Sequence, residues 1–187
     1  MNTSSSNFFL VHFRYILPLF IAMIFFHVGS VKSNASAGNL VNRVSVSFEL
    51  EKNTLRGVSR IALDSDRGIS LQTGSLVIDE ILVNKERVDI QLDEDNLLVI
   101  PAASSGQEVV ISYSKVFPES PGGQRSLLSA KGIVMLDVWY PLTMEESVMD
   151  LTALIPNDFS AISEADDITT ERTPDGKKVH FSFSRPL

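Results

Sequence analysis

The chain has 187 residues, no cysteine, 16 Lys and Arg residues against 23 Asp and Glu residues, and a net charge of −7. Its acidic pI near 4.9 argues against a nucleic-acid partner, because phosphate binding needs clustered Lys and Arg. The lack of cysteine excludes disulfides, thiolate zinc sites and a cysteine nucleophile. The mean hydropathy of +0.12 is nonetheless high for an acidic protein, so its source has to be located.

The excess hydrophobicity lies at the N-terminus, in Phe8–Val31. The most apolar part of this run is shorter than the roughly 20 residues of a spanning helix, and it suits the apolar region of a signal peptide. The small residues Ala35 and Ala37 then predict cleavage before Gly38. An uncleaved membrane anchor is the alternative, because Phe8–Val31 as a whole is long enough to span a bilayer.

We therefore expect two parts in the chain. Residues 1–37 form a hydrophobic signal or anchor helix with two basic residues and no acid, and residues 38–187 form one acidic domain. Either form of the leader implies export to the periplasm or the extracellular space. Contact with the membrane is expected only through residues 8–31, if the leader stays uncleaved.

Apolar and polar residues alternate along most of residues 38–187, as in half-buried strands. The strand-like runs are, in chain order, Val44–Leu50, Leu55–Leu63, Leu76–Val83, Val88–Leu92, Leu97–Ile100, Val109–Tyr113, Ile168–Thr173 and Lys177–Ser184. Turns are expected at Asn84-Lys85 and at Pro174-Asp175-Gly176, and a surface loop at Phe117–Lys131. Short strands at this spacing predict an all-β fold, an antiparallel β-sandwich or barrel.

The sequence contains no recognisable catalytic motif. It has no H-E-x-x-H, no G-x-S-x-G and no glycine-rich phosphate loop, and His180 is the only histidine beyond the leader. A lone histidine without further ligands does not make a zinc site, so His180 is expected on the solvent side of a strand. We assign no catalytic residue, no metal site and no cofactor.

Two acidic clusters are the remaining charged candidates. Asp93-Glu94-Asp95 falls in an expected turn, and Glu164, Asp166 and Asp167 precede the last hairpin. The spacing of a calcium-binding EF-hand is absent, so solvated turns are the preferred interpretation. A hydrolase that uses paired carboxylates would require these acids to converge in one cleft.

The most distinctive string is Trp139-Tyr140-Pro141. Two aromatic rings before a proline can form an interaction surface, for example by stacking on a sugar or a peptide. The alternative is that both rings fill the core or the seam of a domain, as large aromatic side chains mostly do.

The order of these segments resembles the N-terminal β-sandwich domain of the aminopeptidase N family of zinc metallopeptidases. The resemblance covers roughly Val41 to Leu187, and it is carried by Val44–Leu50, Asn53–Gly57 with its small residue, Leu76–Val88, Gln107–Ser114, Lys131–Ile133, Trp139–Pro141, Leu151–Pro156, Ser160–Ser163 and Val179–Ser184. In that family the sandwich braces a catalytic domain that carries G-x-M-E-N and H-E-x-x-H. Neither motif occurs in this sequence, so the resemblance transfers no catalytic or zinc-binding residue.

The resemblance implies a non-catalytic scaffold or interaction domain of an exported aminopeptidase N-like enzyme, present here without the zinc-binding domain. Its expected partner is a peptidase catalytic domain or another envelope protein. The alternative is a stand-alone envelope β-sandwich that binds a peptide, a glycan or a protein through Trp139, Tyr140 and the Phe117–Lys131 loop. A third hypothesis is a hydrolase built from the acidic clusters.

Overall fold

The computed structural model describes residues 9–12, 40–64, 66–89, 91–93, 95–118 and 126–186. The regular elements among these residues are strands, which build three sheets, and one short 3-10 helix, η1 (Leu50–Lys52). The large sheet has eight strands in the order β14 (Asp167–Thr173), β15 (Gly176–Ser182), β12 (Ser147–Ile155), β2 (Leu40–Glu49), β3 (Thr54–Leu63), β8 (Gln107–Val116), β5 (Val77–Val83) and β6 (Glu86–Arg87). The all-β prediction is confirmed.

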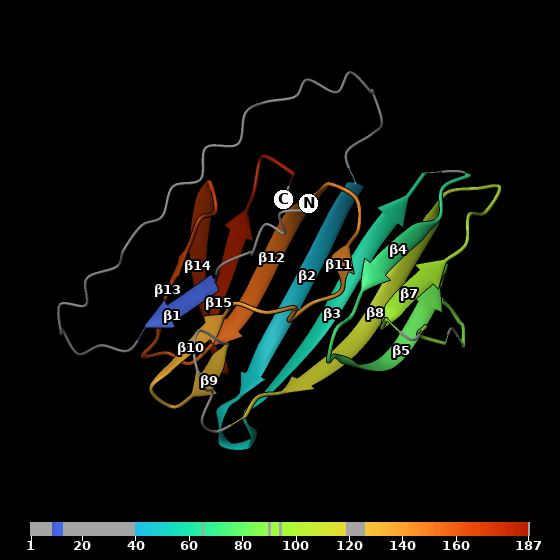
Figure 1. The fold of residues 1–187 in the computed structure, drawn as a ribbon. Coiled ribbons are helices and arrows are strands. Elements are labelled where there is room, and N and C mark those ends of the chain that lie inside the picture. Colours follow the sequence, from blue (N-terminus) through green and yellow to red (C-terminus); the bar gives the residue numbers. More distant parts are fainter. Residues whose placement is uncertain are drawn as a thin grey trace, which may run out of the picture.

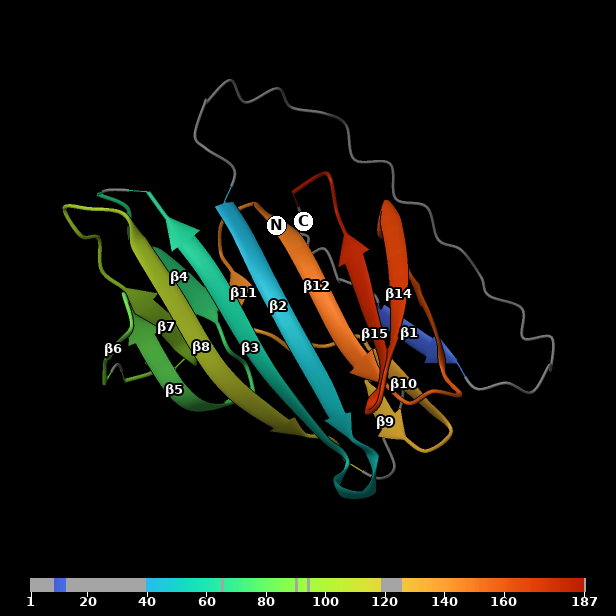
Figure 2. The ribbon, with the colours of Figure 1, turned by 180° about the vertical axis from the view of Figure 1, so that it is seen from behind.

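Two smaller sheets lie on one side of the large sheet, as Figures 1 and 2 show from opposite directions. The four-stranded sheet has the order β13 (Ser160–Ser163), β1 (Phe9–His12), β10 (Gly132–Met135) and β9 (Leu127–Ser129). The three-stranded sheet has the order β11 (Leu142–Thr143), β4 (Ile69–Gln72) and β7 (Leu97–Ile100).

One core fills the space between the two layers. The central strands of the large sheet alternate buried and exposed residues, so every second side chain faces inward, as the period of a strand requires. Both small sheets contribute fully buried residues to the same cluster, including Leu71 and Leu98 from one sheet and Leu128 and Ile133 from the other. The result is a two-layered β-sandwich whose outer layer is divided between two sheets.

The prediction of a wholly antiparallel sandwich is wrong at one pair of strands. β2 and β12 run parallel, with Ser147 opposite Leu40 and Leu154 opposite Ser47, so the large sheet is mixed. A parallel pair needs a long crossover connection, and here the chain passes through the strands from β3 to β11 between β2 and β12. The alternation of apolar and polar residues within a strand does not indicate whether the strand pairs parallel or antiparallel with its neighbour.

The two predicted turns are confirmed. Asn84 and Lys85 have φ angles of 52° and 71°, which is the left-handed pair of a type I′ hairpin between β5 and β6. Gly176 has a φ of 146°, and a Cβ there would lie 2.4 Å from the carbonyl oxygen of Ile155, so this turn requires glycine.

Several boundaries differ from the sequence prediction. The strand that follows Asn84-Lys85 is the two-residue β6, and not Val88–Leu92. β4 lies where the sequence indicated only a connector, and β9 lies inside the expected Phe117–Lys131 loop. Both are short strands whose apolar residues mostly pack inward, so their periodicity extends over too few positions to be recognised.

The N-terminal leader is described only at Phe9–His12. These four residues form strand β1, and not part of the expected signal or anchor helix. The rest of that helix, with residues 13–37, lies outside the described residues. Within the described ranges, no helix has the length and hydropathy needed to cross a membrane.

Candidate functional site

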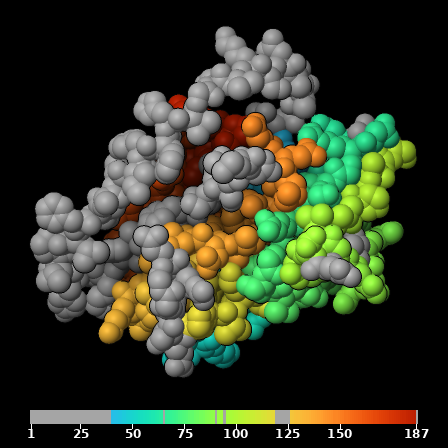
Figure 3. Space-filling view, viewed as in Figure 1, coloured from blue at the N-terminus to red at the C-terminus, as the bar shows by residue number. Residues whose placement is uncertain are grey.

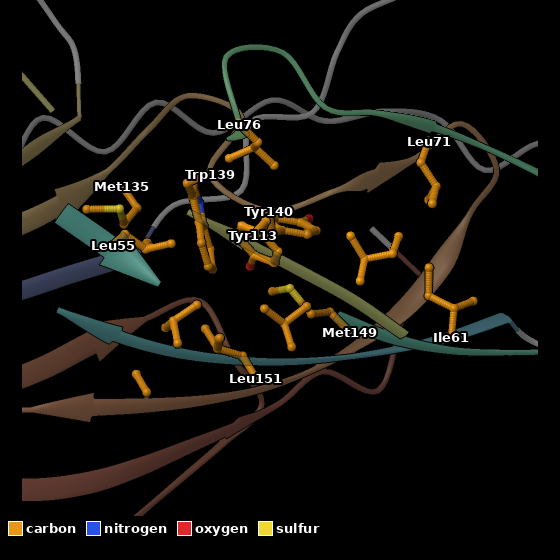
Figure 4. Close-up of a cluster of buried hydrophobic side chains, with 14 of the residues drawn as sticks. Leu55, Ile61, Leu71, Leu76, Tyr113, Met135, Trp139, Tyr140, Met149 and Leu151 are labelled. Carbon is orange, nitrogen blue, oxygen red and sulfur yellow. The ribbon is translucent and has the colours of Figure 1, made fainter. Parts of the chain in front are cut away.

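Trp139 and Tyr140 lie in the core and do not form an exposed aromatic surface. They are 1% and 6% exposed, and Pro141 is also buried. Figure 4 shows Trp139 beside Met135, with Tyr140 and Tyr113 alongside. The two neighbouring rings meet edge to face, with centroids 4.7 Å apart and an interplanar angle of 63°. The expected interaction surface is thus corrected, because packing removes these rings from solvent.

The location of the segment 136–141 explains why it carries large aromatic side chains. It connects β10 of the four-stranded sheet to β11 of the three-stranded sheet. Both small sheets pack on the same core, so bulky side chains are needed where one sheet ends and the other begins. Trp139 and Tyr140 fill this seam.

Buried polar side chains hold the same segment from the large sheet. The Asn42 amide, 1% exposed, donates to the Pro141 carbonyl oxygen at 3.4 Å, and its own oxygen accepts from the Ser59 hydroxyl at 2.6 Å. The Lys115 ammonium donates to the Val138 carbonyl oxygen at 2.7 Å. These contacts satisfy polar groups that would otherwise be buried without partners, so they fix the segment in one position.

Lys115 and Tyr113 are the buried titratable groups beside this segment. Burial lowers the pKa of Lys115, and the nearby carboxylate of Asp137 opposes that shift. Burial also raises the pKa of Tyr113, with a smaller contribution from Tyr140. The Tyr113 hydroxyl has no hydrogen-bond partner among the described residues.

The outward surfaces of the two small sheets carry exposed apolar side chains. Val99, Met144 and Ile162 are 49%, 60% and 51% exposed. Val99 lies opposite Ser70, and the Met144 amide donates to the Ser70 carbonyl oxygen, so both side chains share the outward face of the three-stranded sheet. We name the set of outward apolar residues the small-sheet face: Leu97, Val99, Met144, Leu127, Val134 and Ile162.

Residues of both small sheets reach the molecular surface on this side, as Figure 3 shows. Sequence analysis did not identify the small-sheet face. One signal was present, because Leu97–Ile100 is apolar at every position and does not alternate. A continuous apolar run is typical of a strand that is covered on both faces, whereas among the described residues the outward face of this strand leaves Val99 49% exposed.

The outer face of the large sheet mixes hydroxyl side chains with apolar ones, including the exposed Val77 and Val116. A groove of about 650 Å³ there is lined by Thr152 of β12, Ser45 of β2 and Ser112 of β8, together with apolar residues such as Val58 and Leu154. Arg56 and Lys178 also line the groove. The strand register places the residues that form the floor of this groove in one row. Thr152, Ser45, Val58 and Ser112 lie opposite one another across β12, β2, β3 and β8.

His180 lies on the outer face of β15, as the sequence predicted. Its Nδ1 lies 3.3 Å from Asp150 Oδ1 and its Nε2 lies 3.1 Å from the Ser182 hydroxyl. This is the order of groups in a serine hydrolase, but the neighbouring backbone amides of β12 and β14 lie in the plane of the sheet and face the paired strands. The amides of these paired strands are therefore taken up by the sheet and do not form an oxyanion site.

The described acids of the two clusters lie apart, with Asp93 and Asp95 in the turn before β7 of the three-stranded sheet and Asp166 and Asp167 at the start of β14 of the large sheet. Asp93 follows β6 and its carboxylate accepts from the amides of Asp95 and Leu97, at 3.0 and 2.8 Å. Asp166 precedes β14 and accepts from the Ser184 amide and hydroxyl, which lower its pKa. Among the residues that the structure describes, no group of acids and histidines is arranged to hold a metal ion. The carboxylates do not share a cleft, which contradicts the third hypothesis.

The predicted cleavage residues Ala35, Ala37 and Gly38 lie outside the described residues. They remain a prediction from the sequence.

Comparisons with known proteins add a structural likeness. No family model matches the chain, and no curated protein matches it in sequence. Among solved structures, the M1 zinc metallopeptidase from Deinococcus radiodurans is similar, with a TM-score of 0.62 and 12% identity over 80% of this chain. A two-domain M1 zinc metallopeptidase bound to L-tryptophan has a TM-score of 0.61 and 12% identity over 81% of the chain. Yeast LTA4 hydrolase in complex with bestatin has a TM-score of 0.53 and 15% identity over 80%.

The likeness extends over part of each of these enzymes. The chain covers 39% of the Deinococcus enzyme, 41% of the two-domain enzyme and 27% of the yeast enzyme. The resemblance predicted from the sequence is confirmed at the level of the fold: this chain has the fold of a portion of the M1 zinc metallopeptidases, spanning about two fifths of the length of the first of them.

Proposed function

We propose that the chain is the non-catalytic N-terminal scaffold domain of an exported aminopeptidase N-like zinc metallopeptidase. The main support is the structural match, in which 81% of this chain corresponds to 41% of a two-domain M1 enzyme. The sequence supports a non-catalytic role, because it contains neither H-E-x-x-H nor another recognisable catalytic motif.

The small-sheet face is the surface that this proposal assigns to the catalytic portion. Val99, Met144 and Ile162 are exposed on the outward faces of the two small sheets, and a partner domain that covered them would remove their apolar area from water. A catalytic domain packed on this face would cover these side chains and would be braced by a rigid two-layered sandwich.

The test is recovery of the protein from its native host. We expect a polypeptide with H-E-x-x-H, either continuous with this chain or separate, to be recovered with it and to hydrolyse an aminoacyl 4-nitroanilide. The chain alone with added zinc should show no hydrolysis. Hydrolysis by the chain alone, or recovery without any such polypeptide, contradicts the proposal.

Matched variants locate the contact. Val99→Glu with Met144→Glu should abolish recovery of the zinc-binding polypeptide, or lower peptidase activity where the two are continuous. The control is Val77→Glu with Val116→Glu, which changes two valines that are 59% and 69% exposed on the outer face of the large sheet. Equal effects of the two pairs would argue against the small-sheet face as the contact.

Export is the second part of the proposal. It rests on the apolar leader and on the spacing of Ala35 and Ala37 before Gly38. N-terminal sequencing of the protein from the envelope fraction should start at Gly38. A protein that retains Met1 and stays in the cytoplasm contradicts export.

A second candidate function is a stand-alone envelope binding domain. It is favoured by the hydroxyl-lined groove of about 650 Å³ on the outer face of the large sheet, which offers donors and acceptors for a polar ligand. Chitotetraose is a suitable probe, and backbone amide shifts confined to Ser45, Ser112 and Thr152 would support a glycan site. An unchanged spectrum at millimolar probe argues against glycan binding.

A further inference from the structure

β1 joins the two halves of the four-stranded sheet. Phe9–His12 pairs antiparallel with Gly132–Met135 of β10 on one side and with Ser160–Ser163 of β13 on the other. β10 also pairs with β9, whereas β13 lies at the edge of this sheet and pairs in it with β1. The backbone of β1 therefore supplies the contacts that link β13 to β10.

The same four residues belong to the predicted leader. Phe9–His12 precedes Gly38, so cleavage before Gly38 removes β1 together with the rest of residues 1–37. Neighbouring strands lie about 4.8 Å apart, so loss of β1 leaves β10 and β13 separated by about two such spacings. Each of them then presents an edge of unpaired N–H and C=O groups, which is a template for another strand.

We propose that the gap between β10 and β13 is a strand-acceptor site, filled by β1 in the uncut chain and by an extended apolar segment of a partner polypeptide after cleavage. The proposal rests on the export part of the proposed function. A partner segment would complete the sheet by β-strand addition, with main-chain hydrogen bonds on both of its sides.

The register defines the chemistry of the occupant. Phe9 and Val11 lie opposite Met135 and Ile133, which are both 0% exposed, so the first and third residues of the occupant fall on the core side. The second falls in the row of Val134 and Ile162 on the small-sheet face. The occupant is thus an extended segment with about three apolar residues in succession and without proline, antiparallel to both neighbours.

A second copy of the cleaved chain cannot supply β1 itself. Cleavage removes Phe9–His12 from every copy, so no mature chain retains this strand to donate. The partner polypeptide of the proposed function supplies the segment instead, and the apolar side chain of Ile162, 51% exposed, lies beside the gap to receive it.

The test uses the full chain with a specific protease site in place of residues 32–37, cut after folding. Amide hydrogen exchange of β10 and β13 should be slow before the cut and at least about tenfold faster once the leader fragment is removed. The acetylated peptide Asn-Phe-Phe-Leu-Val-His-Phe-Arg, which copies residues 7–14, should restore slow exchange. The same peptide with Leu10→Pro should not restore it, because proline lacks the N–H and is excluded from central strands.

A second variant keeps the test decisive if the cut chain is unstable. In the uncut full chain, Leu10→Pro should speed exchange of β10 and β13 while β2 and β3 stay protected. Unchanged exchange of β10 and β13 in both experiments overturns the proposal. Equal rescue by the proline peptide, or unfolding of the whole domain without β1, also overturns it, because an acceptor site requires a folded domain with an open gap.

The outcomes separate this proposal from the proposed function. Peptide rescue without any H-E-x-x-H polypeptide in the native host would leave the acceptor site standing and remove the metallopeptidase role. Recovery of an H-E-x-x-H polypeptide together with unchanged hydrogen exchange of β10 and β13 would support the metallopeptidase role and remove the acceptor site.

Discussion

Gly57 on β3 is expected to be the position least tolerant of a methyl group. It lies opposite Tyr113 on β8, and the phenol ring covers it. A Cβ at Gly57 would lie 2.2 Å from Cζ, 2.4 Å from the hydroxyl oxygen and 2.6 Å from Cε2 of Tyr113. Tyr113 is 1% exposed, so its ring has no space to move into. We expect Gly57→Ala to destabilise the domain by about 3 kcal/mol, at the upper end of overpacking effects.

A double-mutant cycle isolates the cause. Tyr113→Leu removes all three close atoms and should by itself destabilise by about 2 kcal/mol through the cavity that it leaves. In the Tyr113→Leu background, Gly57→Ala should be neutral or stabilising by about 0.5–1 kcal/mol, because alanine is less flexible than glycine in the unfolded chain. The expected coupling is therefore about 3–4 kcal/mol.

The assay is urea unfolding followed by far-ultraviolet circular dichroism and by the emission of Trp139, the single tryptophan. Gly106→Ala is the matched control, since its Cβ would lie 3.2 Å from the Leu63 carbonyl oxygen, and it should change stability by less than about 1 kcal/mol. If Gly57→Ala destabilises equally in both backgrounds, the glycine is required by the backbone and the steric argument is refuted.

Three further changes test the structure. Asn42→Ala leaves the Ser59 hydroxyl and the Pro141 carbonyl without their amide partner, so urea unfolding should show a loss of about 2 kcal/mol, and an unchanged midpoint contradicts this role. Lys85→Gly removes the backbone strain of a φ of 71° and should stabilise the domain by about 0.5–1 kcal/mol, which would raise its melting temperature. A lower melting temperature would refute strain at the turn. Hydrogen bonds from Lys52 and Arg56 lower the pKa of Glu49 to about 2, so its contribution to stability is present above the ordinary pKa of 4.5 and is lost as pH falls through 2. The melting temperatures of wild type and Glu49→Gln should differ at neutral pH and converge below pH 2, and a gap that stays constant would show that the carboxylate charge plays no part.

Part of the fold could be predicted from local sequence because it depends on local chemistry. Alternation in Val44–Leu50 and Val109–Tyr113 predicted β2 and β8, since one face of each strand must be apolar. Asn84 tolerates a left-handed φ, and Gly176 adopts a backbone that other residues cannot, so both turns were predictable. The order of these segments also carried the resemblance that the structural match supports.

The candidate site was harder to predict, because exposure depends on what covers a side chain. Trp139 and Tyr140 have the composition of a binding surface, and only their position in the seam between two small sheets buries them. Val99 lies in the apolar run Leu97–Ile100 and Met144 lies beside Thr143 and Glu145, and only the absence of a covering layer in the described structure leaves both exposed. Neither the burial of the two aromatic rings nor the exposure of Val99 and Met144 can be predicted from a few neighbouring residues in the sequence.

The sequence by itself determined the all-β class, the main strands, the turns and the acidic solvated surface, because period and turn chemistry act between near neighbours. The tertiary structure decided which strands pair. It set the parallel pair of β2 and β12, the contact of Gly57 with Tyr113 and the pairing of β1 with β10 and β13. These pairings join residues far apart in the chain, and their free energy comes from a core that exists only when all the strands are assembled.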